Sequence, residues 1–193
     1  MRTHAIVAVS VLALGAVSAR SEPATYRIDP DHTYVSIETP HIPQGSYWRG
    51  KFDRTQSGFI TLDRSAHTGN IEVVIDTKSL DLGLDKLNEI VRGPQFLDAA
   101  TYPTATFRTD RVTFQGDSPV EAIGVLTLHG ISKPLRLKIN SLKCIPDQFL
   151  KVERCAADAS GAIDRSVFGI SNYAQMTGGE VKLAIQVEGL LQK

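Results

Sequence analysis

The sequence predicts an all-β domain, arranged as a closed antiparallel barrel or a sandwich, with a single helix. About eight stretches alternate apolar and polar residues, which is the period of a strand that buries one face. Helical spacing occurs once in the mature chain, where Leu84, Leu87, Ile90 and Val91 recur at intervals of three and four. Strands with one apolar face must close on themselves or pair face to face, so both a barrel and a sandwich fit.

Residues 1–19 have the pattern of a signal peptide and are not expected to belong to the fold. A basic start at Arg2 precedes an apolar run from Ala5 to Val17, and Val17-Ser18-Ala19 fits a small-x-small cleavage motif. The run is too short for a transmembrane helix, so no stable membrane insertion is expected. We therefore predict cleavage after Ala19, a periplasmic or secreted location, and a single folded domain over residues 23–191.

The charge balance argues against some classes of partner. The chain has 21 basic and 21 acidic residues, for a formal net charge of zero, and no run of lysine or arginine. Such a chain has no electrostatic attraction for nucleic acid or for an anionic membrane. The sequence leaves a homodimer open.

Two cysteines, Cys144 and Cys155, remain in the mature chain. Disulfides persist in the compartments that exported proteins reach. The alternative, a zinc site, needs further ligands, and no histidine lies between or beside the two cysteines. Their spacing also differs from that of a C-x-x-C redox motif. The pattern favours a structural disulfide that closes a short loop, with no metal site.

The strands that the alternation predicts before the helix cover residues 26–28, 35–41, 47–52, 58–63 and 71–76. The helix should begin near Asp81 or Asp85, either of which could cap it, and should end at Gly93-Pro94, because proline disfavours a helical conformation in the residue before it. We interpret this helix as a lid over an open end of the strands. Further strands are expected over 105–109 with an extension to 114, and over 121–128, 134–141, 157–164 and 181–187. His129 to Lys133 reads as a hairpin turn.

Several motifs, taken in order, resemble the YceI-like, polyisoprenoid-binding family, in particular its periplasmic branch with a cysteine pair. They are Tyr26 to Thr33 near the mature start, Arg92, Phe96-x-Asp98, Tyr102-Pro103 and Ala105-Thr106-Phe107 around the centre, the hairpin from Gly124 to Leu137, and Arg165 to Ile170. The resemblance covers essentially all of the mature chain, and it implies an eight-stranded, lipocalin-like barrel. It also implies an extended isoprenoid ligand, such as the tail of a quinone or a polyprenyl lipid, and no cofactor. Pro40, Pro43 and Gly93-Pro94 depart from the family pattern and are expected to alter the shape of the mouth.

On this interpretation, one residue in two along each strand faces the lumen. The expected lumen residues are Val35, Ile37, Ile60, Leu62, Ile71, Val73, Ile75, Phe107, Leu126, Leu135, Leu137, Ile163, Val181, Leu183 and Ile185, with Phe96 contributed by the lid. His41, Arg49 and Arg92 are the polar residues expected nearest a head group, and an ordinary surface or turn contact stays open for each of them.

An enzyme and a ligand-free structural barrel are the alternatives. Asp29, Asp31 and His32 lie close in sequence, while His41 and His129 are isolated. A hydrolase or isomerase acting on a lipid-like substrate would have to assemble its catalytic groups from these residues. The sequence has no G-x-S-x-G, H-E-x-x-H, phosphate-loop or dinucleotide motif. We therefore expect a binding protein rather than an enzyme.

Overall fold

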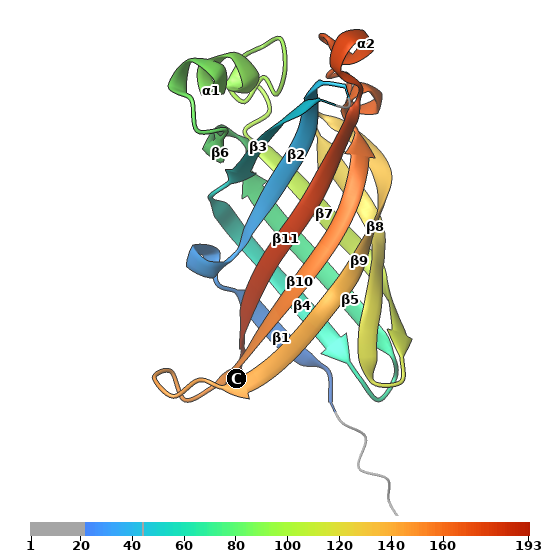
Figure 1. Ribbon diagram of the computed structural model, residues 1–193. Helices are drawn as coiled ribbons and strands as arrows, with labels where there is room; N and C mark the ends of the chain where they lie inside the picture. The colour runs from blue at the N-terminus through green and yellow to red at the C-terminus, as the bar shows by residue number, and fades with distance from the viewer. Residues whose placement is uncertain (1–21, 44) are drawn as a thin grey trace, which may run out of the picture.

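The computed structural model describes residues 22–43 and 45–193, which form a closed antiparallel barrel (Figure 1). The predicted signal peptide lies outside the described residues. The strands are β1 (Ala24–Ile28), β2 (Tyr34–Ile42), β3 (Ser46–Phe52), β4 (Thr55–Asp63), β5 (Thr68–Asp76), β6 (Leu80–Asp81), β7 (Thr104–Gln115), β8 (Ser118–Leu128), β9 (Ile131–Pro146), β10 (Glu153–Asp164) and β11 (Glu180–Leu191). The helices are α1 (Asp85–Arg92) and α2 (Ala174–Thr177), with short 3-10 turns η1 (Pro30–His32), η2 (Thr77–Ser79) and η3 (Arg165–Phe168).

These strands form eight positions around the wall, because three positions are each occupied by two shorter strands. β1 and β2 both pair with β11, along residues 189–191 and 182–186 respectively, with η1 between them. In the same way β4 pairs with β1 and β3 pairs with β2, while β5 pairs with β4 and β6 pairs with β3. The pairing of β1 with β11 closes the ring β1-β4-β5-β7-β8-β9-β10-β11. The prediction of an eight-stranded antiparallel barrel is thus confirmed, and the sandwich is excluded.

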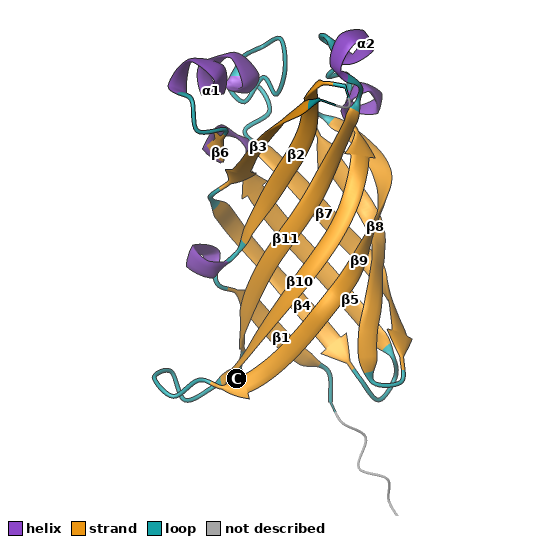
Figure 2. Ribbon diagram, viewed as in Figure 1, coloured by secondary structure: helices purple, strands orange, loops and turns teal. Residues whose placement is uncertain are grey.

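The interrupted strands divide the wall into a lower tier (β1, β4 and β5) and an upper tier (β2, β3 and β6). Both helices lie at the end of the barrel beyond the upper tier (Figure 2). The helix α1 matches the predicted one, and Gly93 follows its last residue as expected. The sequence did not predict α2, since four residues are too few to display a helical period.

The start of α1 differs from the prediction. Leu84 occupies the N-cap position, and its side chain makes no capping hydrogen bond. The carboxylate of Asp81 instead accepts hydrogen bonds from the backbone N–H of Gly83 and from the side-chain amide of Asn88, each at 2.8 Å. The same Asn88 accepts a hydrogen bond from the backbone N–H of Leu82 at 2.7 Å. The buried Asn88 therefore ties the helix to the end of β6, and this replaces a capping carboxylate.

Glycines in the strands allow neighbouring strands to approach closely. A Cβ atom on Gly58 would lie 2.5 Å from Ile28 Cδ1 and 2.7 Å from the carbonyl oxygen of Glu72, and one on Gly124 would collide with the carbonyl of Arg108. These two glycines therefore allow the wall to coil sharply.

Two hairpins are tighter than the sequence suggests. His129 and Gly130 have positive φ angles of 51° and 73° and join β8 to β9 as a two-residue loop, so β9 begins two residues before the predicted turn ends. The predicted disulfide between Cys144 and Cys155 is present. The cysteines face each other on paired strands β9 and β10, so the disulfide encloses the end of this hairpin together with its loop. Both strands simply extend further than the alternation indicated.

Candidate ligand-binding cavity

The lower tier of the barrel encloses an apolar cavity of about 190 Å³. Thr33 and Thr106 are the polar residues among those that line it, and every other lining residue is apolar. The surrounding strands place these side chains inward because successive residues of a strand point to opposite faces. The cavity offers a ligand shape and apolar contact, but few hydrogen-bonding partners.

A larger cavity of about 720 Å³ lies at the upper end, beneath the helices. Leu87, Ile90 and Val91 of α1 and Met176 of α2 contribute to its lining. The helix α1 does not seal it, since 47% of the Ile90 side chain remains exposed. Four residues line both cavities, so the two adjoin at one junction: Phe52, Leu128, Ile163 and Leu183.

Every residue that the sequence placed in the lumen lines one or both of these cavities. Those on the lower cavity are Val35, Ile60, Leu62, Ile71, Val73, Ile75, Phe107, Leu126, Leu135, Leu137, Ile163, Leu183 and Ile185. Those on the upper cavity are Ile37, Phe96, Ile163, Val181 and Leu183. These residues share the inner face of the barrel, and their contact with a ligand stays a prediction.

Phe96 lies at the side of the upper cavity and is only partly buried. Its ring stacks on that of Tyr173, with centroids 6.2 Å apart, so it joins the segment after α1 to the segment before α2. The neighbouring Leu97 is 7% exposed and belongs to the hydrophobic core. Leu97 is therefore the anchor of this segment, and Phe96 forms part of the opening.

Of the three polar residues expected at the mouth, His41 lines the upper cavity. Its ring centroid lies 5.2 Å from that of Trp48, which lines the same cavity. Arg49 lies outside the cavity lining, and its Nε donates to the Glu38 carboxylate at 2.7 Å from a largely exposed side chain. Arg92 is also absent from the lining, because its guanidinium donates twice to the carbonyl oxygen of Leu80, at 2.8 and 2.6 Å. The contacts of Arg49 and Arg92 are thus of the ordinary surface or turn kind, the alternative that the sequence left open for each.

Sequence reasoning missed the arginine that does line the upper cavity, Arg165. Its Nη1 donates to the carbonyl oxygen of Ile170 at 2.8 Å, and its Nη2 donates to Thr177 Oγ1 at 3.3 Å. The guanidinium carbon lies 5.9 Å from the centre of the Phe96 ring. Burial lowers the pKa of Arg165 below its usual value. The motif from Arg165 to Ile170 was visible in the sequence, but nothing in it indicated which way the arginine points.

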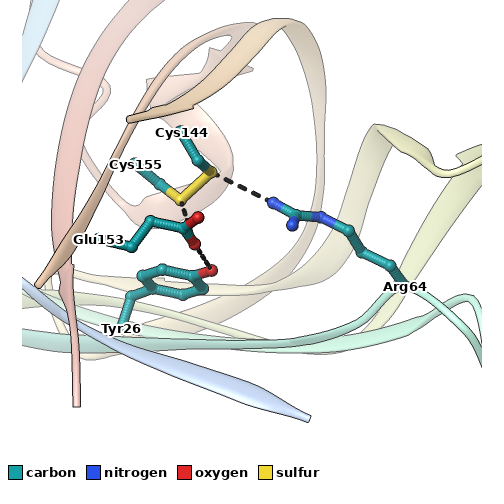
Figure 3. Close-up of a disulfide and its surroundings, with 5 residues drawn as sticks. All are labelled: Tyr26, Arg64, Cys144, Glu153 and Cys155. Atoms are coloured by element: carbon teal, nitrogen blue, oxygen red, sulfur yellow. Dashed lines mark hydrogen bonds between the residues drawn. A yellow bond between two sulfur atoms is a disulfide. The ribbon is translucent and has the colours of Figure 1, made fainter. Parts of the chain in front are cut away.

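Polar side chains surround the disulfide at the opposite end of the barrel (Figure 3). The Tyr26 hydroxyl donates to Glu153 Oε1 at 2.6 Å, and Arg64 Nη2 donates to Cys144 Sγ at 3.2 Å. Burial, reinforced by the hydrogen bond to Glu153, raises the pKa of Tyr26 to about 12. These polar groups lie at the end of the barrel away from the helices.

The histidines and aspartates considered for catalysis do not converge. His32 Nδ1 lies 3.0 Å from Asp29 Oδ2 in an exposed pair at η1, while His129 Nδ1 lies 3.0 Å from the carbonyl oxygen of Phe168. Burial alone would raise the pKa of Asp29, but hydrogen bonds from Arg154 and His32 outweigh it and lower that pKa. Asp29 also belongs to a cluster in which Arg154 donates to Asp29, Asp147 and Glu188. These groups hold η1 and the β9–β10 hairpin against β11.

No helix of residues 22–43 and 45–193 combines the length and hydropathy needed to cross a membrane. The fold and the cavity define an eight-stranded, lipocalin-like barrel with an apolar interior that is open at one end.

The chain belongs to the YceI-like family, whose model matches residues 26–189. It is 29% identical to a UPF0312 protein of Yersinia pestis (strain Pestoides F) over 195 residues, and the match covers all of both chains. Among solved structures it is similar to BcnA of Burkholderia cenocepacia, with a TM-score of 0.69 and 21% identity over 83% of this chain and 98% of that one. It is also similar to a polyisoprenoid binding domain from Saccharophagus degradans implicated in plant cell wall breakdown, with a TM-score of 0.62 and 18% identity over 86% of this chain and 98% of that one.

Proposed function

We propose that this protein is an exported carrier that holds an isoprenoid-chain amphiphile, such as a quinone or a polyprenyl lipid, inside its barrel. The observation that supports this most strongly is the pair of adjoining cavities, apolar below and open to the mouth above. A long apolar chain that fills them leaves water, and removal of apolar surface from water is the driving force for binding. The carrier makes and breaks no bonds; it buries its ligand.

Two further observations support the assignment. The polyisoprenoid binding domain from Saccharophagus degradans has the same fold, and its ligand class suits a narrow apolar lumen. The signal-peptide pattern of residues 1–19 and the Cys144–Cys155 disulfide suit an oxidising compartment outside the cytoplasm. The residues proposed to contact the tail are those of the inner face, from Val35 on β2 to Ile185 on β11.

The proposal is tested by titrating a series of quinones that share one head group and differ in tail length. Each isoprene unit adds five carbon atoms, and ligands of this size gain about 0.3 kcal/mol per heavy atom. Each unit inside the barrel should therefore contribute about 1.5 kcal/mol, or roughly tenfold in affinity. The affinity should rise with tail length and then level off, once the cavities are full and further units remain in solvent.

The same titration separates the alternatives. An enzyme that reads the head group would show little dependence on the tail, and would release a product. A structural barrel without a ligand would bind no member of the series. Either result would refute the carrier, and mass spectrometry of an organic extract from natively purified protein would identify the ligand directly.

A further inference from the structure

The upper cavity carries an unbalanced positive charge. Among the described residues that line it there is no aspartate or glutamate, and Arg165 is the one with a permanent charge. The remaining polar groups of the lining are neutral hydroxyls, the indole of Trp48 and the imidazole of His41. An apolar cavity with one convergent cation has the composition of a site that orients an oxygen-rich group.

Arg165 has hydrogen-bonding capacity to spare. A guanidinium carries five N–H donors. Arg165 uses Nη1 to donate to the Ile170 carbonyl oxygen and Nη2 to donate to Thr177 Oγ1, so further N–H groups remain for a ligand. None of the described carboxylates forms an ion pair with it. The adjacent Asp164 instead accepts hydrogen bonds from the backbone N–H and the hydroxyl of Ser166, at 2.9 and 2.6 Å. The two neutral acceptors fix the direction of the guanidinium, and Asp164 acts on its charge only through space, without an ion pair.

Two other arginines of the described residues are paired with carboxylates. Arg49 pairs with Glu38 at 2.7 Å, and Arg154 lies within 2.9 Å of three carboxylates. Arg165 is partly withdrawn from water, and among the described residues no carboxylate lies within ion-pairing distance of it. A desolvated charge is unfavourable unless an opposite charge approaches it, so the site favours an anion that can reach the mouth.

We propose that Arg165 selects ligands with an anionic oxyacid head, a phosphate monoester or a carboxylate, over neutral quinones and alcohols with the same tail. This inference rests on the proposed carrier function and decides between the head-group classes that the function leaves open. The fork of a guanidinium matches the paired oxygens of these groups, and charge-assisted hydrogen bonds of this kind are about twice as strong as neutral ones. The tail then occupies the apolar cavities below.

The test uses the full mature protein and three probes that share one tail: geranylgeraniol, geranylgeranoic acid and geranylgeranyl monophosphate. We expect the wild-type protein to bind both anions at least about tenfold more tightly than the alcohol. Arg165→Gln should abolish this preference, because it should weaken the binding of both anions at least about tenfold more than the binding of geranylgeraniol. Arg49→Gln is the matched control, because it removes an arginine on the outer face and should preserve the preference. Inorganic phosphate alone should not displace the bound phosphate lipid, since it lacks the tail.

Each outcome has one meaning. Equal binding of all three probes by the wild-type protein, or a preference that survives Arg165→Gln, overturns the role of Arg165 and leaves the carrier function standing. Binding of none of the probes refutes the carrier function itself. Displacement by inorganic phosphate would overturn the requirement for a lipid tail. Thermal melting checks that each variant folds; if Arg165→Gln does not, Arg165→Lys should retain a reduced preference for the anions, because it keeps the charge and loses the fork.

Discussion

Filling the lower cavity from the wall should stabilise the protein and weaken ligand binding at the same time. Ala159 lines that cavity from β10, and leucine at this position adds three carbon atoms. At about 0.8 kcal/mol per buried carbon, Ala159→Leu should raise the free energy of unfolding by up to about 2 kcal/mol. The competing effect, overpacking, costs about 1–3 kcal/mol when no space is available. The cavity of about 190 Å³ corresponds to roughly six water molecules in bulk, which exceeds the added volume, so stabilisation should prevail.

The assay compares thermal melting and quinone titration of delipidated wild-type and variant proteins. The melting temperature should rise by about 5 °C, and the affinity should level off at a shorter tail. Ala162→Leu is the control, because Ala162 lies on the same strand with its side chain exposed, and neither quantity should change. A destabilised Ala159→Leu variant that binds the full tail as well as wild type would refute the reasoning, since it would mean that the ligand does not use this cavity.

Three further predictions concern the lid, the disulfide and Tyr26. In denaturant titrations, Leu97→Ala should lower the free energy of unfolding by about 2–5 kcal/mol, because Leu97 is buried. Phe96→Ala should lower it less and should mainly alter ligand exchange, because Phe96 is partly exposed. The reverse order would place Phe96 in the core. Replacing Cys144 and Cys155 by serine should lower the free energy of unfolding by about 3 kcal/mol and preserve ligand binding, and a loss of binding would contradict the disulfide's position away from the mouth. The raised pKa of Tyr26 favours the protonated phenol in the folded state. The contribution of Tyr26 to stability should therefore be complete below about pH 10 and lost as the pH rises toward 12. Tyr26→Phe should abolish this alkaline loss in pH-dependent melting.

The inner face of the barrel was predictable because it depends on a local rule. Residues such as Val35, Ile37 and Leu137 alternate with polar neighbours, and a strand in a closed wall converts that alternation directly into inside and outside. The same rule overlooked the ends of the strands. Cys144 and Cys155 lie in segments with poor alternation, and only the pairing of β9 with β10 makes those segments strands.

The polar mouth was less predictable because the direction of an arginine depends on distant partners. Arg49 points outward because the register of β2 and β3 sets it opposite Glu38. Arg92 is held by the carbonyl of Leu80, which is available where η2 leads into the two-residue β6. Arg165 follows the last alternating residue of β10, and its direction is set by Ile170 and Thr177 in a segment with no regular period. Each of these contacts depends on tertiary geometry that residue spacing does not record.

The way β11 is shared among its neighbours determines the order in which the chain can fold. This strand pairs with β10, β1 and β2, so the N-terminal strands gain partners from a segment about 150 positions further along the sequence. β1 can pair with β4, and β2 with β3, before β11 has been made, but the pairings with β11 that close the wall must wait for it. Contacts this distant in sequence slow folding, to milliseconds or seconds in all-β domains. During that interval the apolar inner faces of the N-terminal strands have no closed lumen to face, so they are open to aggregation.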